Sequence, residues 1–220
     1  PESPSAAGWQ SAAGWAWRNP CGPPHPDRPE PKKSYLYRSS TCTMTDRTTI
    51  VLETILRRKS VRHFTGAPVT KSCLLALLKA GMAAPSARNR QPVVFVAVTE
   101  RQTLNTLGEG LPYTKMLFEA GACIVVCGDA TVPLQEGATD LWTQDAAAAA
   151  ENILIATEAM GLGAVWSALY PYPEREGHVS KLLNLPPHIT PFCIIPVGHP
   201  TGEDLPKEKF SPDKIRWEGW

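Results

Sequence analysis

The stretch from Leu141 to Met160 constrains the fold most strongly, because it predicts a long helix with very little polar surface. Its consecutive alanines, Ala146–Ala150, allow other elements to approach closely. Its polar exceptions, Gln144, Glu151 and Glu158, recur at every seventh position, so they form one narrow seam along the helix. A helix of this kind must be buried, either in the core of its own chain or against a second subunit.

Runs of β-branched and apolar residues predict the strands of a sheet around this helix. The runs are Val93–Val98, Ala122–Cys127, Ala164–Leu169 and Pro191–Val197. Apolar periodicity and capping residues predict further helices at residues 46–59, 71–84, 102–108, 114–120 and 174–184. Because strands are separated by helices, the sequence predicts an α+β or α/β domain with one central sheet.

Residues 1–43 differ in composition from the rest of the chain. They are crowded with proline, glycine, serine and alanine, and their apolar residues follow neither a helical nor a strand period. They contain no apolar segment of the kind found in a secretory signal. We therefore expect a disordered tail, tag or leader over 1–43 and a folded domain over 44–220.

Charge and cysteine usage exclude several classes of protein. Lys and Arg number 22 against 21 Asp and Glu, so we expect no nucleic-acid partner, and no apolar run is long enough to predict a membrane span. The 6 cysteines form no CxxC pair, and histidines do not cluster with them or with acids at metal-ligand spacing. We expect buried, reduced cysteines, no metal and a cytoplasmic location.

A basic edge follows the first predicted helix. Arg58, Ser60 and Arg62 occupy alternate positions, so in an extended segment their side chains point the same way. Two guanidiniums and a hydroxyl on one edge suit a phosphate, because the arginine fork matches phosphate oxygens. The alternative is a solvated basic turn, since cations also suit a helix C-terminus.

Three further segments carry candidate binding groups. The loop 85–92 holds neutral hydrogen-bonding side chains, although it also fits an ordinary connection. The glycines of residues 161–163 allow the backbone of 164–166 to approach a flat ligand, although they also fit a helix C-cap. Lys207 and Lys209 add late cations, which also fit a solvated tail. The sequence has no dinucleotide-binding, Walker A, nucleophile-elbow or zinc-protease motif.

With these segments in this order, the chain resembles the nitroreductase family of FMN-dependent oxidoreductases over about residues 46–220. The resemblance rests on residues 57–64 (RRKSVRHF), 84–92 (APSARNRQP), 144–166 (from Gln-Asp to GLGAVW) and 197–210 (from VGHP to KEKF). It implies an α+β fold with helices flanking a mostly antiparallel central sheet. It also implies an obligate homodimer with two FMN sites at the subunit interface.

The resemblance also implies roles for individual residues. Arg58 and Ser60 would meet the FMN phosphate and ribityl chain, and Arg62 the N1–C2 edge of the flavin. Residues 85–89 would reach the ring from the other subunit, while backbone at 164–167 would lie beside N5 and O4. The implied cofactor-binding residues are Arg58, Lys59, Ser60, Arg62, Pro85, Ser86, Asn89, Gln144, Ala164, Val165, Trp166, Ser167, Lys207 and Lys209.

Two positions depart from the family pattern. Lys209 stands where many relatives have an arginine that closes on the phosphate, so a weaker, single contact is expected there. Val93 stands where an aromatic residue often follows Gln-Pro, which changes the packing of the pocket.

The implied function is oxidation of NADH or NADPH with ping-pong transfer to a nitroaromatic, a quinone or an activated alkene. No catalytic side chain is needed beyond the flavin, and Arg62 would stabilise the negative charge of its reduced form. The alternatives are a flavin carrier or sensor, a relative with other flavin chemistry such as dehalogenation or flavin fragmentation, and a generic anion site. The second of these usually requires an added lid, and residues 111–115 and 133–140 are short.

Overall fold

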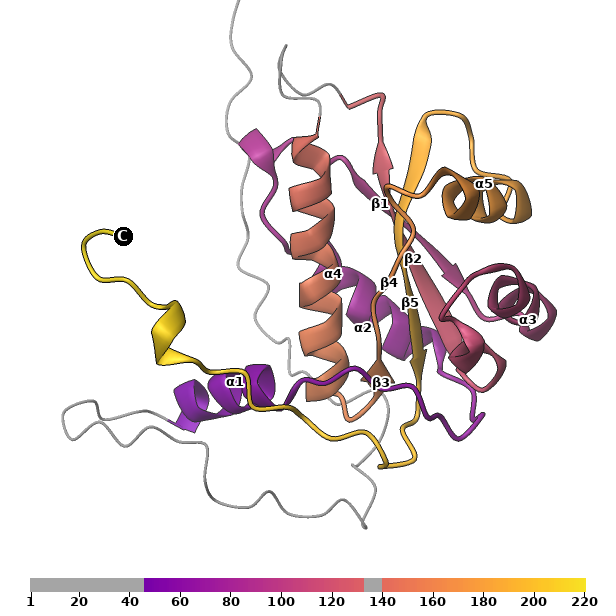
Figure 1. The fold of residues 1–220 in the computed structure, drawn as a ribbon. Helices are drawn as coiled ribbons and strands as arrows, with labels where there is room; N and C mark the ends of the chain where they lie inside the picture. Colours follow the sequence, from indigo (N-terminus) through magenta and orange to yellow (C-terminus); the bar gives the residue numbers. More distant parts are fainter. Residues whose placement is uncertain (1–45, 133–139) are drawn as a thin grey trace, which may run out of the picture.

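The computed structural model describes residues 46–132 and 140–220, so the predictions for residues 1–43 lie outside the described part. At its centre is one sheet in the order β1-β2-β5-β3, with β4 also paired to β5, and every pairing is antiparallel (Figure 1). The strands are β1 (Val93–Val98), β2 (Ala122–Asp129), β3 (Gly163–Ala164), β4 (Ser167–Ala168) and β5 (Ile189–Gly198). The predicted α+β fold with an antiparallel central sheet is confirmed.

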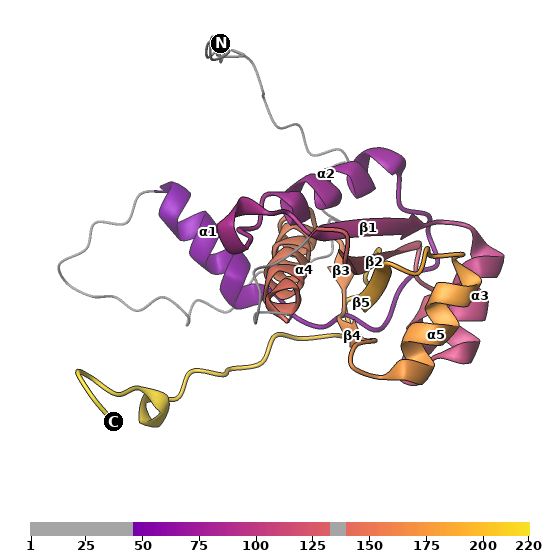
Figure 2. The ribbon, with the colours of Figure 1, turned by 90° about the horizontal axis from the view of Figure 1, so that it is seen from above.

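Helices cover both faces of this sheet (Figures 1 and 2). One face carries α2 (Lys71–Met82) and α4 (Leu141–Ala159), and the other carries α3 (Arg101–Gly110) and α5 (Pro173–Leu182). Outside these layers, α1 (Asp46–Arg57) lies near the C-terminal end of α4. Short 3-10 turns are η1 (Ala87–Asn89), η2 (Lys115–Phe118) and η3 (Pro212–Lys214).

Strand β2 shows why the sheet is buried on both sides. Ile124 and Val126 join the core beneath α2 and α4, whereas Cys123, Val125 and Cys127 join the core beneath α3 and α5. All five are fully buried, as the twofold alternation of a strand between two helical layers requires. Cys123 and Cys127, four residues apart, therefore lie on the same face of the strand.

The cysteines of the sheet are buried thiols. Cys123, Cys127 and Cys193 are free, and burial raises the pKa of Cys123 and of Cys127 to about 12. These thiols stay protonated and unreactive at neutral pH. Cys73 is instead disulfide-bonded, so the prediction of reduced cysteines is wrong at that position.

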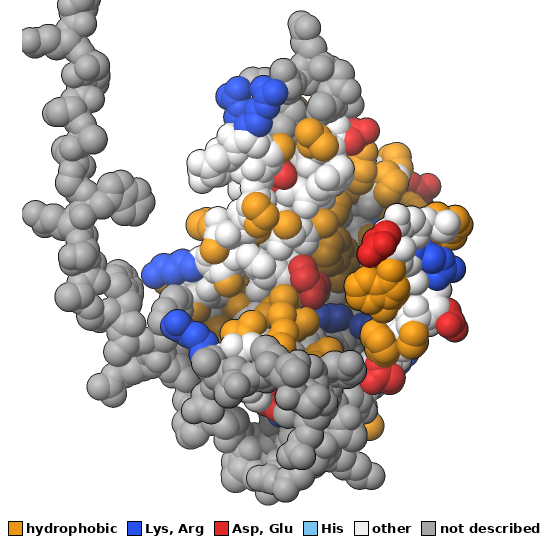
Figure 3. All heavy atoms as spheres, turned by 90° about the vertical axis from the view of Figure 1, so that its left-hand side faces the viewer, with side chains coloured by type: hydrophobic (Ala, Val, Ile, Leu, Met, Phe, Trp, Pro, Cys, Tyr) orange, Lys and Arg blue, Asp and Glu red, His pale blue; other side chains and the backbone are white. Residues whose placement is uncertain are grey.

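The prediction of a buried helix at 141–160 is confirmed by α4. Ala146, Ala150, Ile153 and Leu154 pack into the core with α2, β2 and β5. On its other side, α4 is apolar but only half-buried, at residues 147–148 and 155–156. Figure 3 shows the face on that side of the molecule, and hydrophobic side chains occupy much of its middle.

The strand predicted at 164–169 is divided in the structure into β3 and β4. Val165 falls opposite Pro196 in the register that Ala164 and Ser167 share with β5. Because proline has no N–H to donate, the pairing there keeps only a long hydrogen bond of 3.4 Å from Val165 N to Pro196 O. This interruption leaves residues 165–166 free to line a groove.

Two absences hold for the described residues, 46–132 and 140–220. No helix among them is long and apolar enough to cross a membrane. No group of three His, Cys, Asp or Glu side chains among them could hold a metal ion.

Candidate cofactor site

The basic edge is anchored by a buried residue in its middle. Val61 is 1% exposed, and its backbone N–H donates to Ala164 O at 2.9 Å. This close approach requires Gly163, because a Cβ there would lie 2.5 Å from Val61 Cγ1. The anchor holds Ser60 and Arg62 beside the segment that runs from β3 to β4.

The C-terminal segment is fastened to the other side of this edge. Thr65 N donates to His199 O at 2.9 Å, and Thr201 N donates to His63 O at 3.1 Å. Asp204 Oδ2 accepts from the backbone N–H groups of Arg62 and His63, at 2.8 and 3.2 Å.

The carboxylate of Asp204 is stabilised by these contacts. Burial raises its pKa, but the bonds from Arg62 N, His63 N and the His63 ring outweigh that effect, so its pKa lies below the ordinary value. Lys207 and Lys209 follow shortly afterwards as exposed residues of the segment that runs past α1 (Figure 1). They do not line the groove described below.

Arg58 and Lys59 pair with the polar seam of α4. Arg58 Nε lies 3.1 Å from Glu151 Oε1, and Lys59 Nζ lies 2.9 Å from Glu158 Oε2. The second pair is the more buried, with side chains 19% and 6% exposed. The seam of an otherwise apolar helix therefore orients the basic edge.

The prediction that the side chains of Arg58, Ser60 and Arg62 lie in line along one extended segment is wrong at Arg58. Arg58 N donates to Thr54 O at 3.0 Å, so Arg58 caps the C-terminal end of α1. Residues 58 to 62 are consequently not one extended strand with three side chains in line. Lys59 pairs with Glu158, so its side chain faces α4.

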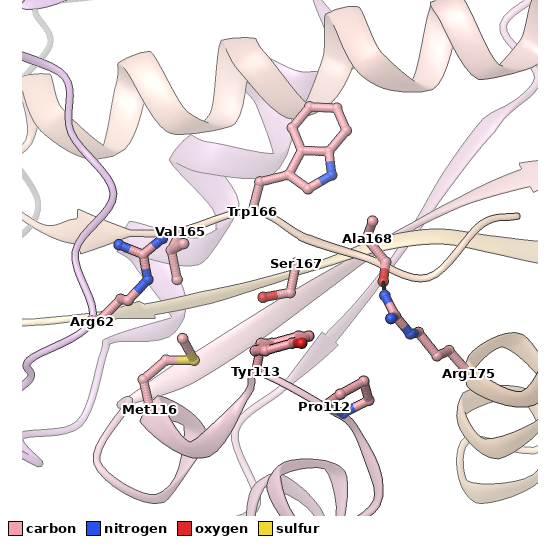
Figure 4. A pocket seen from close by; sticks show the side chains of 9 residues that line it. All are labelled: Arg62, Pro112, Tyr113, Met116, Val165, Trp166, Ser167, Ala168 and Arg175. Carbon is pink, nitrogen blue, oxygen red and sulfur yellow. Dashed lines mark hydrogen bonds between the residues drawn. The ribbon is translucent and has the colours of Figure 1, made fainter. Parts of the chain in front are cut away.

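A groove lies where the basic edge meets β3 and β4 (Figure 4). It encloses ≈ 190 Å³, and of the predicted site residues Arg62, Val165, Trp166 and Ser167 line it. Ala164 is held next to it by the hydrogen bond from Val61. The guanidinium of Arg62 has no carboxylate within ion-pair distance among the described residues. The groove is therefore a positively charged, open site of the kind that a flat anionic ligand prefers.

Sequence reasoning missed the opposite wall of this groove. That wall contains Pro112, Tyr113, Met116 and Arg175. Tyr113 is 85% exposed and has a positive φ of 61°, a conformation that is uncommon for a non-glycine residue. One signal was available in the sequence: Arg175 follows Pro173 in the first turn of a predicted helix, where the helix dipole disfavours a cation.

The loop of residues 85–92 is strained and tied down. Arg88, Asn89 and Gln91 have φ of 53°, 54° and 55°, in the left-handed region that costs energy for such residues. Ser86 Oγ accepts from Gln91 N at 2.9 Å, which stabilises the turn. The loop is bound to α4 by Asp145, whose Oδ1 accepts a hydrogen bond from Ala87 N at 3.0 Å.

This loop and α1 lie near opposite ends of α4 (Figure 1). Asp145 holds the loop and Glu158 holds the basic edge. At 1.5 Å per residue, the two anchors are separated by about 20 Å along the helix. Within one chain, the loop that holds Pro85, Ser86 and Asn89 therefore lies far from Lys59, and Gln144 is exposed in the first turn of α4.

The comparisons with known proteins identify the family. The profile of the nitroreductase family matches residues 55–111 and 100–199. A protein from Methanothermobacter thermautotrophicus, named "Putative NADH dehydrogenase/NAD(P)H nitroreductase", is 36% identical over 170 residues, which are 77% of this chain and 87% of that protein. The chain belongs to the nitroreductase family.

Solved structures of related proteins agree in fold. A protein of the same name from Parabacteroides distasonis superposes with a TM-score of 0.73 and 49% identity, covering 77% of this chain and 98% of its own. The NADPH:FMN oxidoreductase from Vibrio harveyi, solved with NAD+, has a TM-score of 0.68 and 28% identity, covering 78% of both chains. The recognition of the family from the ordered set of sequence segments is confirmed.

Proposed function

We propose that this protein is an FMN-dependent oxidoreductase that uses NADH or NADPH to reduce nitroaromatics, quinones or related acceptors. Family membership supports this proposal, as does the activity named for the relative from Vibrio harveyi. The observation that carries it is the guanidinium of Arg62, which has no carboxylate partner among the described residues and faces a groove walled by residues 165–168. FMN, when bound, supplies the redox chemistry, accepting hydride from the nicotinamide and passing electrons to the acceptor.

The residues of the groove fit such a cofactor. Arg62 presents a fixed positive charge where the pyrimidine edge of a reduced flavin would be negative, and this favours the reduced form. Gly163 permits the close backbone approach between residues 61 and 164 that shapes this wall. Among the described residues, none of those lining the groove is acidic, so nothing there opposes an anion.

Arg58 and Ser60 fit the phosphate. Glu151 holds Arg58 through Nε, which leaves its terminal nitrogens without an ion-pair partner in the described residues. The Ser60 side chain is half-buried beside it. A phosphate dianion prefers such a charged fork with a hydroxyl. We propose that Lys209, near the C-terminus of the chain, also contacts the phosphate, with Lys207 close to it in the sequence.

We infer that two copies of the chain complete each site. The resemblance assigns the contacts from Pro85, Ser86 and Asn89 to a second chain. The tether of their loop, Asp145, lies about 20 Å along α4 from Glu158, which holds Lys59. The groove of ≈ 190 Å³ is smaller than the roughly 300–1,000 Å³ of a usual ligand pocket. The apolar side chains of α1 are open to solvent at 43% to 64%, namely Ile50, Val51, Leu52, Ile55 and Leu56. An exposed apolar face of this kind supports a subunit interface.

We propose a ping-pong order, because the nicotinamide and the acceptor would share this groove. Both the nicotinamide and the acceptor would approach the same open side, so the oxidised nucleotide must leave before the acceptor enters. Parallel lines in double-reciprocal plots with menadione as acceptor would support this order, whereas intersecting lines would contradict it.

The absorption spectrum of freshly purified protein tests the cofactor. Bound FMN gives a band near ~450 nm, and NADH or NADPH should bleach it under anaerobic conditions. Continuous oxidation of either nucleotide with menadione or nitrofurazone distinguishes an enzyme from a flavin carrier or sensor. A colourless protein that does not take up FMN and oxidises neither nucleotide would contradict the proposal.

A further inference from the structure

The far end of the groove carries a second arginine. Arg62 and Arg175 reach the groove from opposite sides, with Tyr113 and Ser167 between them (Figure 4). Arg175 comes from the first turn of α5, where a cation gains nothing from the helix dipole. Its position therefore calls for an explanation other than helix stability.

The guanidinium of Arg175 is fixed by two contacts. Nη1 donates to Ala168 O at 3.0 Å, and Cζ lies 3.9 Å from the centroid of the Tyr172 ring. In the described part of the chain no carboxylate lies within ion-pair distance of it, and its neighbours Glu174 and Glu176 do not line the groove. A preorganised, unpaired cation is the usual device for binding an oxyanion, because little conformational freedom is lost.

The surroundings of Arg175 suit an aromatic body attached to that anion. Tyr113 is largely exposed, and Pro112 and Met116 give the same wall an apolar surface. Exposed aromatic and thioether side chains favour flat rings. Since Arg62 and residues 165–167 are assigned to the flavin in the proposed function, the wall of Tyr113 and Arg175 remains for the exchanging ligand.

We propose that Arg175 determines acceptor specificity by binding an anionic substituent, such as a sulfonate or carboxylate, on an aromatic electron acceptor. This inference rests on the proposed function for its redox context. Arg175 binds the substituent while Tyr113 and Met116 contact the ring. The interaction is a charge-assisted hydrogen bond, so it discriminates between charged and neutral ligands of the same shape.

Binding of a non-reducible matched pair tests the proposal on the FMN-loaded protein. Naphthalene-2-sulfonate and the uncharged naphthalene-2-sulfonamide are titrated by calorimetry into wild type, Arg175→Gln and Arg175→Lys. We expect Arg175→Gln to weaken sulfonate binding about tenfold while sulfonamide binding changes less than about twofold. Arg175→Lys keeps the charge and should retain part of the preference. Equal weakening of both ligands, or no weakening of either, would overturn the proposal.

Steady-state kinetics then identifies the source of the anion. The value of kcat/KM for 1,4-naphthoquinone-2-sulfonate should fall about tenfold in Arg175→Gln, and that for menadione, which has no anionic substituent, should fall much less. A fall in kcat/KM for NADPH or NADH instead would assign Arg175 to a nucleotide phosphate and overturn its role toward the acceptor. Failure of the proposed function would appear differently, as wild-type protein that oxidises neither nucleotide with any acceptor, and sulfonate binding would still decide the role of Arg175.

Discussion

The two ends of α4 are built in different ways. Towards its C-terminal end, charged contacts hold the basic edge: Lys59 pairs with Glu158 at that end, and Arg58 pairs with Glu151 near the middle of the helix. At its N-terminal end, Asp145 accepts from Ala87 N and holds a loop of strained, mostly neutral residues. The first end offers charge and the second offers a rigid shape. A flat anionic cofactor that binds in one orientation needs both the charge and the rigid wall. We therefore expect one chain to supply the charge and a second chain to supply the wall.

The largest effect should come from closing the C-terminal end with Gly163→Val. Its Cβ would lie 2.5 Å from Val61 Cγ1, so the basic edge must move away from β3. We expect a loss of about 3 kcal/mol in the free energy of unfolding, and loss of FMN on purification. Urea unfolding and the ratio of flavin to protein absorbance measure both. The control is Gly177→Ala, since nothing lies within 4 Å of a Cβ there; if Gly163→Val behaved like the control, the close approach would be unimportant.

Subunit complementation tests directly whether the two ends meet between chains. One chain carries Arg62→Ala and its differently tagged partner carries Asn89→Ala, and the mixed dimer is purified. If each site takes Arg62 from one chain and Asn89 from the other, one site is fully wild type and the mixed dimer keeps about half of wild-type turnover. Each homodimer should lose about tenfold or more, as removal of a charged hydrogen bond predicts for Arg62→Ala. A mixed dimer no better than the homodimers would place both residues in one chain's site.

At the N-terminal end, Asp145→Ala should free the loop without changing the basic edge. Ala87 N loses its acceptor, which costs about 1–2 kcal/mol of local stability. Hydrogen exchange of the Ala87 amide should accelerate about tenfold, while exchange of the Val61 amide stays the same. Asp145→Asn keeps a carbonyl acceptor and serves as the matched control. Equal acceleration at both amides would mean that the two ends are not independent.

The smallest effect concerns the fastening of the C-terminal segment by Asp204. Because its pKa is lowered in the folded protein, the carboxylate stabilises the fold at neutral pH, and this contribution is lost as the pH falls through the folded pKa, below 3.8. Asp204→Asn should therefore lower the free energy of unfolding by about 1 kcal/mol at pH 7 and by less at pH 3. If the difference in the free energy of unfolding between wild type and Asp204→Asn grew as the pH falls, the stabilising role of the carboxylate would be contradicted.

Much of the fold could be predicted from the sequence because its signals are local. The strand Val93–Val98 has the predicted bounds, and α2 and α4 begin at the predicted residues, because period and capping are properties of a few adjacent side chains. The division of 164–169 was missed because its cause, Pro196, lies in another strand. Arg58 was misplaced because alternation alone does not reveal where a helix makes its last hydrogen bond.

The residues of the candidate site also fall into those that the sequence predicted and those that it did not. Arg62 and the residues of 164–167 could be predicted because they lie in recognisable segments, and the structure brings them together through the bond from Val61 N to Ala164 O. Tyr113 and Arg175 were missed, since their segments reach the groove only through packing of α3 and α5 on the sheet.

The sequence by itself determined the element types, the apolar helix at the centre and the charged residues available to an anion, because periodicity and charge are written along the chain. The tertiary structure decided which of those charges are neutralised. Lys59 is paired with Glu158, while Arg62 and Arg175 face a groove without a carboxylate partner in the described residues. It also separated the loop at 85–92 from the basic edge by the length of α4. The reason is that pairing and separation depend on which surfaces pack together, and only long-range contacts fix that.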